Sequence, residues 1–292
     1  IAVVAALIGA AAVFWFVTVP KTVAVADLPP HTPNLGNGRT MFIAGGCAAC
    51  HRTQKQTDAT RLGVGLQLHT AFGEFFVPNI SPDPKDGIGA WSEAQFVTAM
   101  TKGTSPTGEH LYPAFPYPSY QHMRIDDVRD LFAYLKSLPP IAGRVRPHEL
   151  KFPFSIRRSV GVWKLLFLDG KTFTPDPAQS AEWNRGAYLV NGPGHCAECH
   201  SPRNRLGAVI ESRRLDGGPS PTDQGGVPSI RQDKLGAWSV DDIVGTLTTG
   251  DTPDSDRVGS VMIDVVRNTA ELSGADRHAM AVYIKSLPPP AK

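Results

Sequence analysis

The chain has 292 residues, enough for about two domains of ordinary size, each with its own core. Its formal net charge of +2 is too small to indicate a nucleic-acid partner, and no basic patch interleaved with aromatic residues is present. The 26 prolines and 28 glycines predict many loops between the elements of regular structure.

The N-terminal segment 1–19 reads IAVVAALIGAAAVFWFVTV and carries no charge. About 20 apolar residues suffice for a helix to cross the bilayer core, and Phe14, Trp15 and Phe16 lie near one end, as in an aromatic belt. A cleavable signal peptide is the competing interpretation, but the apolar run exceeds a usual signal-peptide core. We therefore expect an uncleaved transmembrane anchor over residues 1–19, followed by an extended Pro-rich tether over residues 20–36.

Two pentapeptides have the pattern C-x-x-C-H, and they contain all four cysteines. In the c-type haem attachment signature, both thiols form thioethers with the haem and the following histidine ligates the iron. A thioredoxin-like pair or half of a zinc site would also use C-x-x-C, but two copies, each followed by histidine, favour haem. We therefore predict two covalently bound haem c groups. The attaching cysteines are Cys47, Cys50, Cys196 and Cys199, and the proximal iron ligands are His51 and His200.

The chain repeats itself after 149 residues, the spacing from Cys47 to Cys196 and from Tyr134 to Tyr283. Between these markers, VPNI at 77–80 recurs as VPSI at 227–230, and YLKSLPP at 134–140 recurs as YIKSLPP at 283–289. A repeat of this length indicates a duplicated domain rather than a solenoid. We expect haem domains over 37–140 and 183–292, joined by an interdomain linker over 141–182.

Helix signals are clearest in the first repeat. A helix is expected to begin near Gly38 and lead into the first C-x-x-C-H, and another covers 91–100 with Ser92 as its N-cap. The strongest covers 126–135, with carboxylates in its first turn and a stop at the following prolines. The Gly- and Pro-rich stretch 52–90 is expected to be loop. The aromatic and basic linker either folds across both domains or meets a membrane surface or a partner subunit.

The sixth iron ligand separates two functions, because a methionine gives a saturated electron carrier and an open position permits chemistry on a bound molecule. For the second haem, Met262 is the predicted distal ligand, since Met280 has core-like spacing within the closing helix. For the first haem, the position equivalent to Met262 is a proline. Among the possibilities for the distal position of the first iron, Met123 ranks first, His110 second and a five-coordinate iron without a distal ligand third. His69 and His122 are the remaining candidates.

The C-x-x-C-H pair, the loop LYPAFPY at 111–117 and the two Y-[LI]-K-S-L-P-P endings resemble the membrane-bound multihaem cytochrome c subunits of bacterial periplasmic dehydrogenases, alcohol and gluconate dehydrogenases among them. The resemblance covers residues 37–290. It implies a mainly α fold of two tandem class I cytochrome c domains that pass electrons from haem to haem. The chain departs from this family pattern in two ways. It has two haem motifs where such subunits often have three, and it has Phe115 where their loop commonly has methionine.

The expected function is therefore a membrane-anchored, periplasmic dihaem electron carrier of the bacterial inner membrane, with no catalytic residue of its own. Its donor would be a periplasmic dehydrogenase or another respiratory donor, and its acceptor a quinone, a cytochrome or a terminal oxidase complex. The alternative is a dihaem redox enzyme of the peroxidase or thiosulfate dehydrogenase type, with an open or weakly ligated first haem. The periplasmic location follows because C-x-x-C-H haem attachment takes place outside the bacterial cytoplasm.

Overall fold

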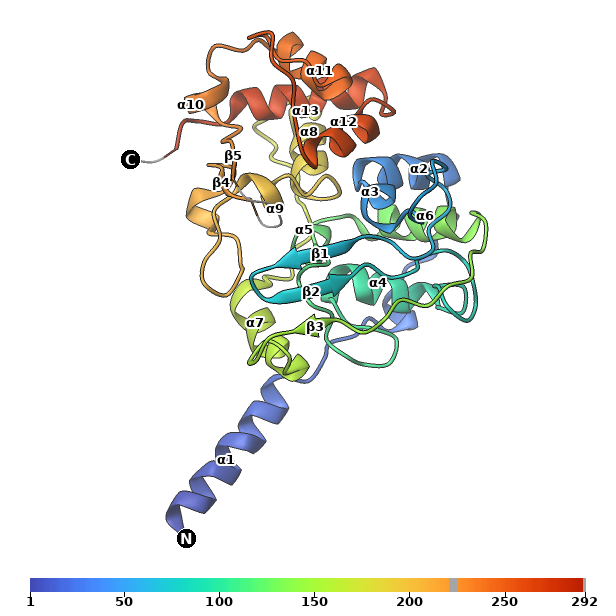
Figure 1. Cartoon of the computed structure of the whole chain (residues 1–292), viewed down its shortest axis with the longest axis vertical. Helices are drawn as coiled ribbons and strands as arrows, with labels where there is room; N and C mark the ends of the chain where they lie inside the picture. Colours follow the sequence, from blue (N-terminus) through green and yellow to red (C-terminus); the bar gives the residue numbers. More distant parts are fainter. Residues whose placement is uncertain (221–224, 291–292) are drawn as a thin grey trace.

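A computed structural model describes residues 1–220 and 225–290. The apolar N-terminal segment forms the helix α1 (Ala2–Val17), which extends away from the rest of the chain with its side chains exposed (Figure 1). At about 1.5 Å per residue, its 16 residues measure about 24 Å, less than the ~30 Å bilayer core. Among the described residues, no helix has both the length and the apolar character required of a membrane span.

The predicted transmembrane helix over residues 1–19 is therefore wrong. The helix ends at Val17 because Pro20 disfavours a helical conformation at Val19. Thr18 instead turns its side chain back, and its Oγ1 donates to the Phe14 carbonyl at 2.6 Å. The apolar residues of segment 1–19 thus outnumber those that the helix includes.

The Pro-rich segment after α1 lies against the body of the molecule. Within it is a short 3-10 turn, η1 (Val25–Asp27). The Val23 amide donates to Thr98 Oγ1 at 2.9 Å, and His31 Nε2 lies 2.7 Å from Asp130 Oδ1. The segment predicted as a tether is thus attached along its length to two helices of the first repeat, those that contain Thr98 and Asp130.

The first repeat is helical around its C-x-x-C-H turn. Its helices are α2 (Leu35–Ala44), α3 (Cys47–His51), α4 (Glu93–Lys102), α5 (Tyr117–Tyr120) and α6 (Ile125–Lys136). The predicted N-cap of α4 is confirmed: Ser92 Oγ accepts from the Gln95 amide at 3.2 Å, and Gln95 Oε1 accepts from the Ser92 amide at 2.8 Å. The predicted closing helix is confirmed as α6, with Asp126 and Asp127 in its first turn.

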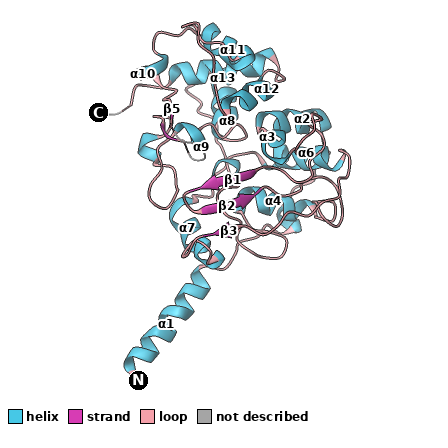
Figure 2. Ribbon diagram, in the orientation of Figure 1, coloured by secondary structure: helices cyan, strands magenta, loops and turns pink. Residues whose placement is uncertain are grey.

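The prediction that 52–90 is entirely loop is wrong. It contains a hairpin of β1 (Gln67–Thr70) and β2 (Gly73–Phe76), in which Thr70 lies opposite Gly73, and β2 also pairs antiparallel with β3 (Glu149–Leu150) (Figure 2). Gly73 has φ +123°, and a Cβ there would lie 2.3 Å from the Glu149 carbonyl oxygen. The glycine that indicated a loop thus permits both the turn and the close approach of β3.

The second repeat reuses this helical plan. Its helices are α8 (Ala181–Asn191), α9 (Ala197–His200), α10 (Gln232–Leu235), α11 (Val240–Thr249), α12 (Met262–Thr269) and α13 (Gly274–Ser286), with a 3-10 turn η3 (Glu211–Arg213) and strands β4 (Gly218–Pro219) and β5 (Gly226–Val227). α8 packs on α13 as α2 packs on α6 (Figure 1). In each repeat, the helix before the haem motif therefore crosses the closing helix.

Glycines permit both crossings. A Cβ on Gly38 in α2 would lie 2.1 Å from the Asp130 carbonyl oxygen, and one on Gly186 in α8 would lie 1.9 Å from that of Ala279. These backbones approach too closely for any side chain.

Gly186→Ala should lower the free energy of unfolding by about 1–3 kcal/mol, because α8 and α13 must separate to admit the methyl group. Thermal unfolding followed by circular dichroism measures the effect. Gly245→Ala in α11 is the matched control: a Cβ there meets nothing within 4 Å, so this variant should keep or slightly raise the stability. Equal melting temperatures for the two variants would contradict the crossing argument.

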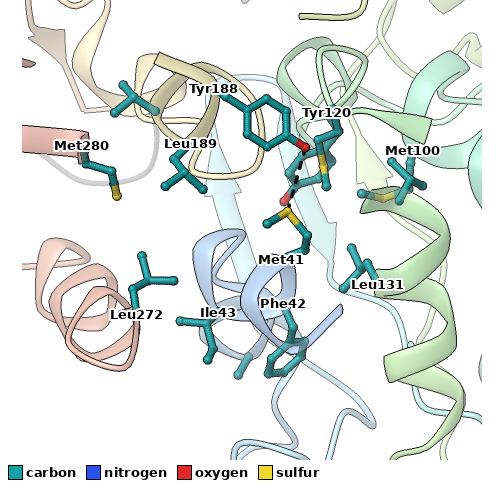
Figure 3. Close-up of a cluster of buried hydrophobic side chains, with 14 of the residues drawn as sticks. Met41, Phe42, Ile43, Met100, Tyr120, Leu131, Tyr188, Leu189, Leu272 and Met280 are labelled. Carbon is teal, nitrogen blue, oxygen red and sulfur yellow. Dashed lines mark hydrogen bonds between the residues drawn. The ribbon is translucent and has the colours of Figure 1, made fainter. Parts of the chain in front are cut away.

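The two repeats share one apolar core rather than two. Figure 3 shows side chains of both repeats in contact, with the Tyr188 hydroxyl of α8 4.0 Å from the Met41 sulfur of α2. Met41 and Leu189 have no exposed surface. The Tyr188 hydroxyl also donates to Asp127 of α6. This shared core joins the two repeats that contain the haem motifs.

The segment between the repeats contains β3, a 3-10 turn η2 (Arg157–Ser159) and the helix α7 (Val160–Phe167). Trp163 of α7 packs edge-on against Tyr117 of the first repeat and donates from Nε1 to the Leu206 carbonyl of the second at 2.9 Å. The segment thus contacts both repeats, although Phe152, Leu165 and Leu166 remain exposed.

Candidate haem sites

The first C-x-x-C-H forms the single-turn helix α3, which follows the left-handed Gly46 (φ +57°). The loop after it folds back onto the turn, and the Leu66 amide donates to the Cys50 carbonyl at 2.9 Å. Gly65 permits this contact, because a Cβ there would lie 2.2 Å from the same carbonyl oxygen. In the second repeat, the Gly217 amide donates to the His200 carbonyl at 2.8 Å. Both turns are therefore held by backbone contacts with the following loop.

The two motif histidines are oriented in the same way. His51 Nδ1 lies 2.8 Å from the Pro78 carbonyl oxygen, and His200 Nδ1 lies 2.8 Å from that of Pro228. A carbonyl can only accept, so Nδ1 carries the proton and the lone pair of a neutral imidazole is on Nε2. Fixing one ring nitrogen to a carbonyl is how proteins orient a metal-ligating histidine.

The prolines in these contacts were noted in the sequence only as markers of the repeat. Pro78 belongs to VPNI and Pro228 to VPSI, 27 and 28 residues after their histidines. Their recurrence at nearly the same distance from each motif was the available signal. It did not reveal the role, because the group that acts is a backbone carbonyl rather than a side chain.

Burial keeps both histidines neutral. It lowers the pKa of His51 to about 4, against a smaller upward effect of the hydrogen bond to Pro78. It also lowers the pKa of His200 below its usual value. At neutral pH each imidazole is therefore uncharged, with an Nε2 lone pair for an iron.

The cysteines do not have the electrostatics of a redox pair. Burial raises the thiol pKa of Cys47 and of Cys196 to about 12, and that of Cys50 to about 11. A catalytic C-x-x-C needs the opposite shift, towards a thiolate. Within residues 1–220 and 225–290, no three His, Cys, Asp or Glu side chains converge as a zinc site would require. Two neutral thiols on one turn, beside an oriented neutral histidine, fit a covalently attached haem.

The predicted distal ligands lie in different surroundings. Met262 is the first residue of α12 and is half-buried against the shared core. Met123 follows α5 and has no exposed surface, and its Cγ lies 3.7 Å from where a Cβ on Gly192 would be. Met280 is buried in α13, as the core interpretation predicted. The assignments of Met262 and Met123 to an iron stay predictions.

The histidine candidates for the first iron have other partners. His110 is buried, and its Nε2 lies 2.8 Å from the Thr18 carbonyl at the end of α1. His122 Nδ1 lies 2.8 Å from the Lys171 carbonyl, and His69 Nδ1 lies 2.6 Å from Glu74 Oε2 on the hairpin. Each ring thus has one nitrogen bound within the protein.

Known proteins resemble this chain in sequence. The cytochrome c family profile matches residues 35–139. A dihaem c-type cytochrome of Cereibacter sphaeroides is 48% identical over 259 residues, covering 88% of this chain and 87% of that protein. The chain belongs to the dihaem c-type cytochromes. It carries two covalently bound haem c groups, as the paired motifs predicted.

Two further relatives of this dihaem cytochrome are longer proteins named for dehydrogenases. A nicotinate dehydrogenase subunit of Pseudomonas putida is 38% identical over 278 residues, which cover 90% of this chain and 23% of that protein. The cytochrome c subunit of the alcohol dehydrogenase (quinone) of Gluconacetobacter polyoxogenes is 38% identical over 258 residues, 84% of this chain and 54% of that subunit. The resemblance to cytochrome c subunits of bacterial dehydrogenases is confirmed, although the chain spans only part of these two relatives.

Proposed function

We propose that this dihaem cytochrome receives electrons from a dehydrogenase and passes them to a downstream acceptor. The haem groups supply reversible one-electron chemistry at iron. Cys47 and Cys50 hold the first haem and Cys196 and Cys199 the second. His51 and His200 are the proximal ligands, each with its lone pair aimed away from the proline carbonyl that orients it.

The observation that carries this proposal is the equivalence of the two histidines. Both have the same tautomer and the same 2.8 Å contact to a proline carbonyl, and burial lowers the pKa of both. A dihaem enzyme needs an open position on one iron, whereas a carrier needs both irons saturated. We propose Met262 as the distal ligand of the second iron and Met123 as that of the first, which completes two saturated sites.

The names of the relatives support a dehydrogenase as electron donor, and the quinone in one of them supports a quinone as acceptor. Anaerobic mixing of the oxidised cytochrome with an alcohol dehydrogenase and its substrate should reduce both haems, and a soluble quinone should then reoxidise them. Absorbance in the α-band follows both steps. Catalytic turnover of peroxide without reduction by any dehydrogenase would instead identify a dihaem redox enzyme.

We also infer that both repeats function in the periplasm, since covalent attachment through C-x-x-C-H occurs outside the bacterial cytoplasm. Alkaline phosphatase joined after residue 290 should be active in intact cells. An active cytoplasmic reporter at that position, with haem attached, would contradict this location.

A further inference from the structure

The two haem-attachment turns contact each other directly. His195 immediately precedes Cys196, and its Nε2 lies 3.2 Å from the carbonyl oxygen of Gly45, two residues before Cys47. A Cβ placed on Gly45 would lie 3.6 Å from the Pro193 carbonyl oxygen and 3.6 Å from Cys47 Sγ. Since Gly45 contributes only an acceptor, His195 must donate from Nε2. This hydrogen bond connects the residues that immediately precede the two motifs.

The short helix α5 of the first repeat packs against the same contact. The ring of Tyr120 meets that of His195 edge-on, with centroids 5.6 Å apart, and its hydroxyl lies 3.5 Å from the Gly45 carbonyl oxygen. One residue earlier, Ser119 Oγ donates to Glu198 Oε1 at 2.8 Å. Glu198 is the second variable residue of the second motif. α5 therefore contacts the second motif at its start and at its middle.

Both carboxylate oxygens of Glu198 have hydrogen-bond donors. Its other carboxylate oxygen accepts from Arg203 Nη2 at 2.6 Å, and its side chain is only 13% exposed. Ser119 and Tyr120 are likewise buried. A half-buried ion pair with an added hydroxyl donor favours one geometry, because loss of a partner leaves a partly desolvated charge unsatisfied. We name Gly45, Ser119, Tyr120, His195 and Glu198 the turn junction.

The backbone conformation of His195 is uncommon for a residue with a side chain. His195 has φ +39°, in the left-handed region where glycine is favoured. Its equivalent 149 residues earlier is Gly46, which has φ +57°. The second repeat thus has a histidine where the first has the unstrained glycine. A non-glycine residue in this region is strained relative to glycine and persists where surrounding contacts require it.

We propose that His195 is a positioning residue, which fixes the spacing of the two haem-attachment turns and thereby the rate of electron exchange between the two haems. This inference rests on the proposed electron-carrier function. The exchange moves one electron and no atom or proton: one iron goes from ferrous to ferric as the other goes from ferric to ferrous. Its rate depends on the separation of the two groups, and the turn junction is where the protein sets that separation.

His195→Asn tests the role, because asparagine accepts the left-handed backbone but is too short to keep the contacts of the imidazole. Pulse radiolysis delivers one electron to each oxidised molecule, and the absorbance then follows its redistribution between the haems. We expect two attached haems by mass and unchanged reduction potentials. The exchange rate should fall several-fold, because it decreases as the two haem-attachment turns, and with them the two haems, move apart.

A second readout does not depend on electron transfer. Amide hydrogen exchange should become faster over 45–51 and 195–200 in His195→Asn, because each turn loses its contact with the other. Ser119→Ala removes the hydroxyl donor to Glu198 from the same junction. It should also slow electron exchange, and it provides the test if His195→Asn fails to fold.

The matched control is Glu271→Gln, which breaks an ion pair between the repeats outside the turn junction, Arg39 Nη2 to Glu271 Oε2 at 2.7 Å, with both side chains about half exposed. This variant should leave the exchange rate unchanged. An unchanged rate in both junction variants, or equal slowing in Glu271→Gln, overturns the inference. Absence of exchange in the unaltered protein also overturns it, while reduction of each haem by a dehydrogenase would still support the carrier function.

Discussion

Replacing Cys196 and Cys199 with alanine should leave the cytochrome with one covalently bound haem instead of two. The thioethers to these sulfurs are the only covalent bonds between the second haem and the chain, and His200 alone would hold the group reversibly. Intact-protein mass spectrometry under denaturing conditions should show loss of one haem mass. The pyridine haemochrome absorbance per chain should fall by about half, since one of two like groups is removed.

The reciprocal variant, Cys47→Ala with Cys50→Ala, provides the matched control. It should lose one haem as well, and the combined variant with all four cysteines replaced should have none. Because the two repeats share one core, we expect each double variant to unfold at a lower temperature. Two haems retained in either double variant would disprove the assignment of that motif.

Met262→Leu should lower the reduction potential of one haem while both haems stay attached. A thioether ligand stabilises ferrous iron relative to ferric iron, so its loss favours the oxidised state. The expected fall is on the order of 0.1 V, a fraction of the roughly 0.8 V range that axial ligands span. Spectroelectrochemical titration of both haems measures the change.

Met280→Leu is the control for this potential shift, because Met280 is buried in α13 and has no predicted contact with iron. Its substitution should leave both potentials unchanged and cost less than about 1.5 kcal/mol of stability. If Met262→Leu also leaves both potentials unchanged, Met262 is a core residue and another group ligates the second iron.

Local signals in the sequence predicted the helices well. Ser92 and the acidic first turn of α6 specify their helices by contacts within a few residues, and both were predicted from the sequence. The hairpin of β1 and β2 was missed because Gly73 indicates a break, whereas its role depends on β3 from a distant part of the chain. The predicted transmembrane helix was wrong because apolar content alone does not set helix length.

The haem sites show the same limit. The thiols and histidines of each motif are adjacent in sequence, so their pattern could be recognised directly. The carbonyls of Pro78 and Pro228 and the contact of His195 with Gly45 lie across folded distances, and no side-chain pattern marks a backbone acceptor. A histidine at the position where the first repeat has Gly46 was the one visible sign of the turn junction.

Near-infrared magnetic circular dichroism of the oxidised protein tests the central claim, that two equivalent saturated haems make this chain an electron carrier. We expect two low-spin irons, each with histidine and methionine as axial ligands, and loss of one such signature in Met123→Leu. A high-spin iron that binds cyanide in the unaltered protein would contradict the carrier function and identify an open site for chemistry.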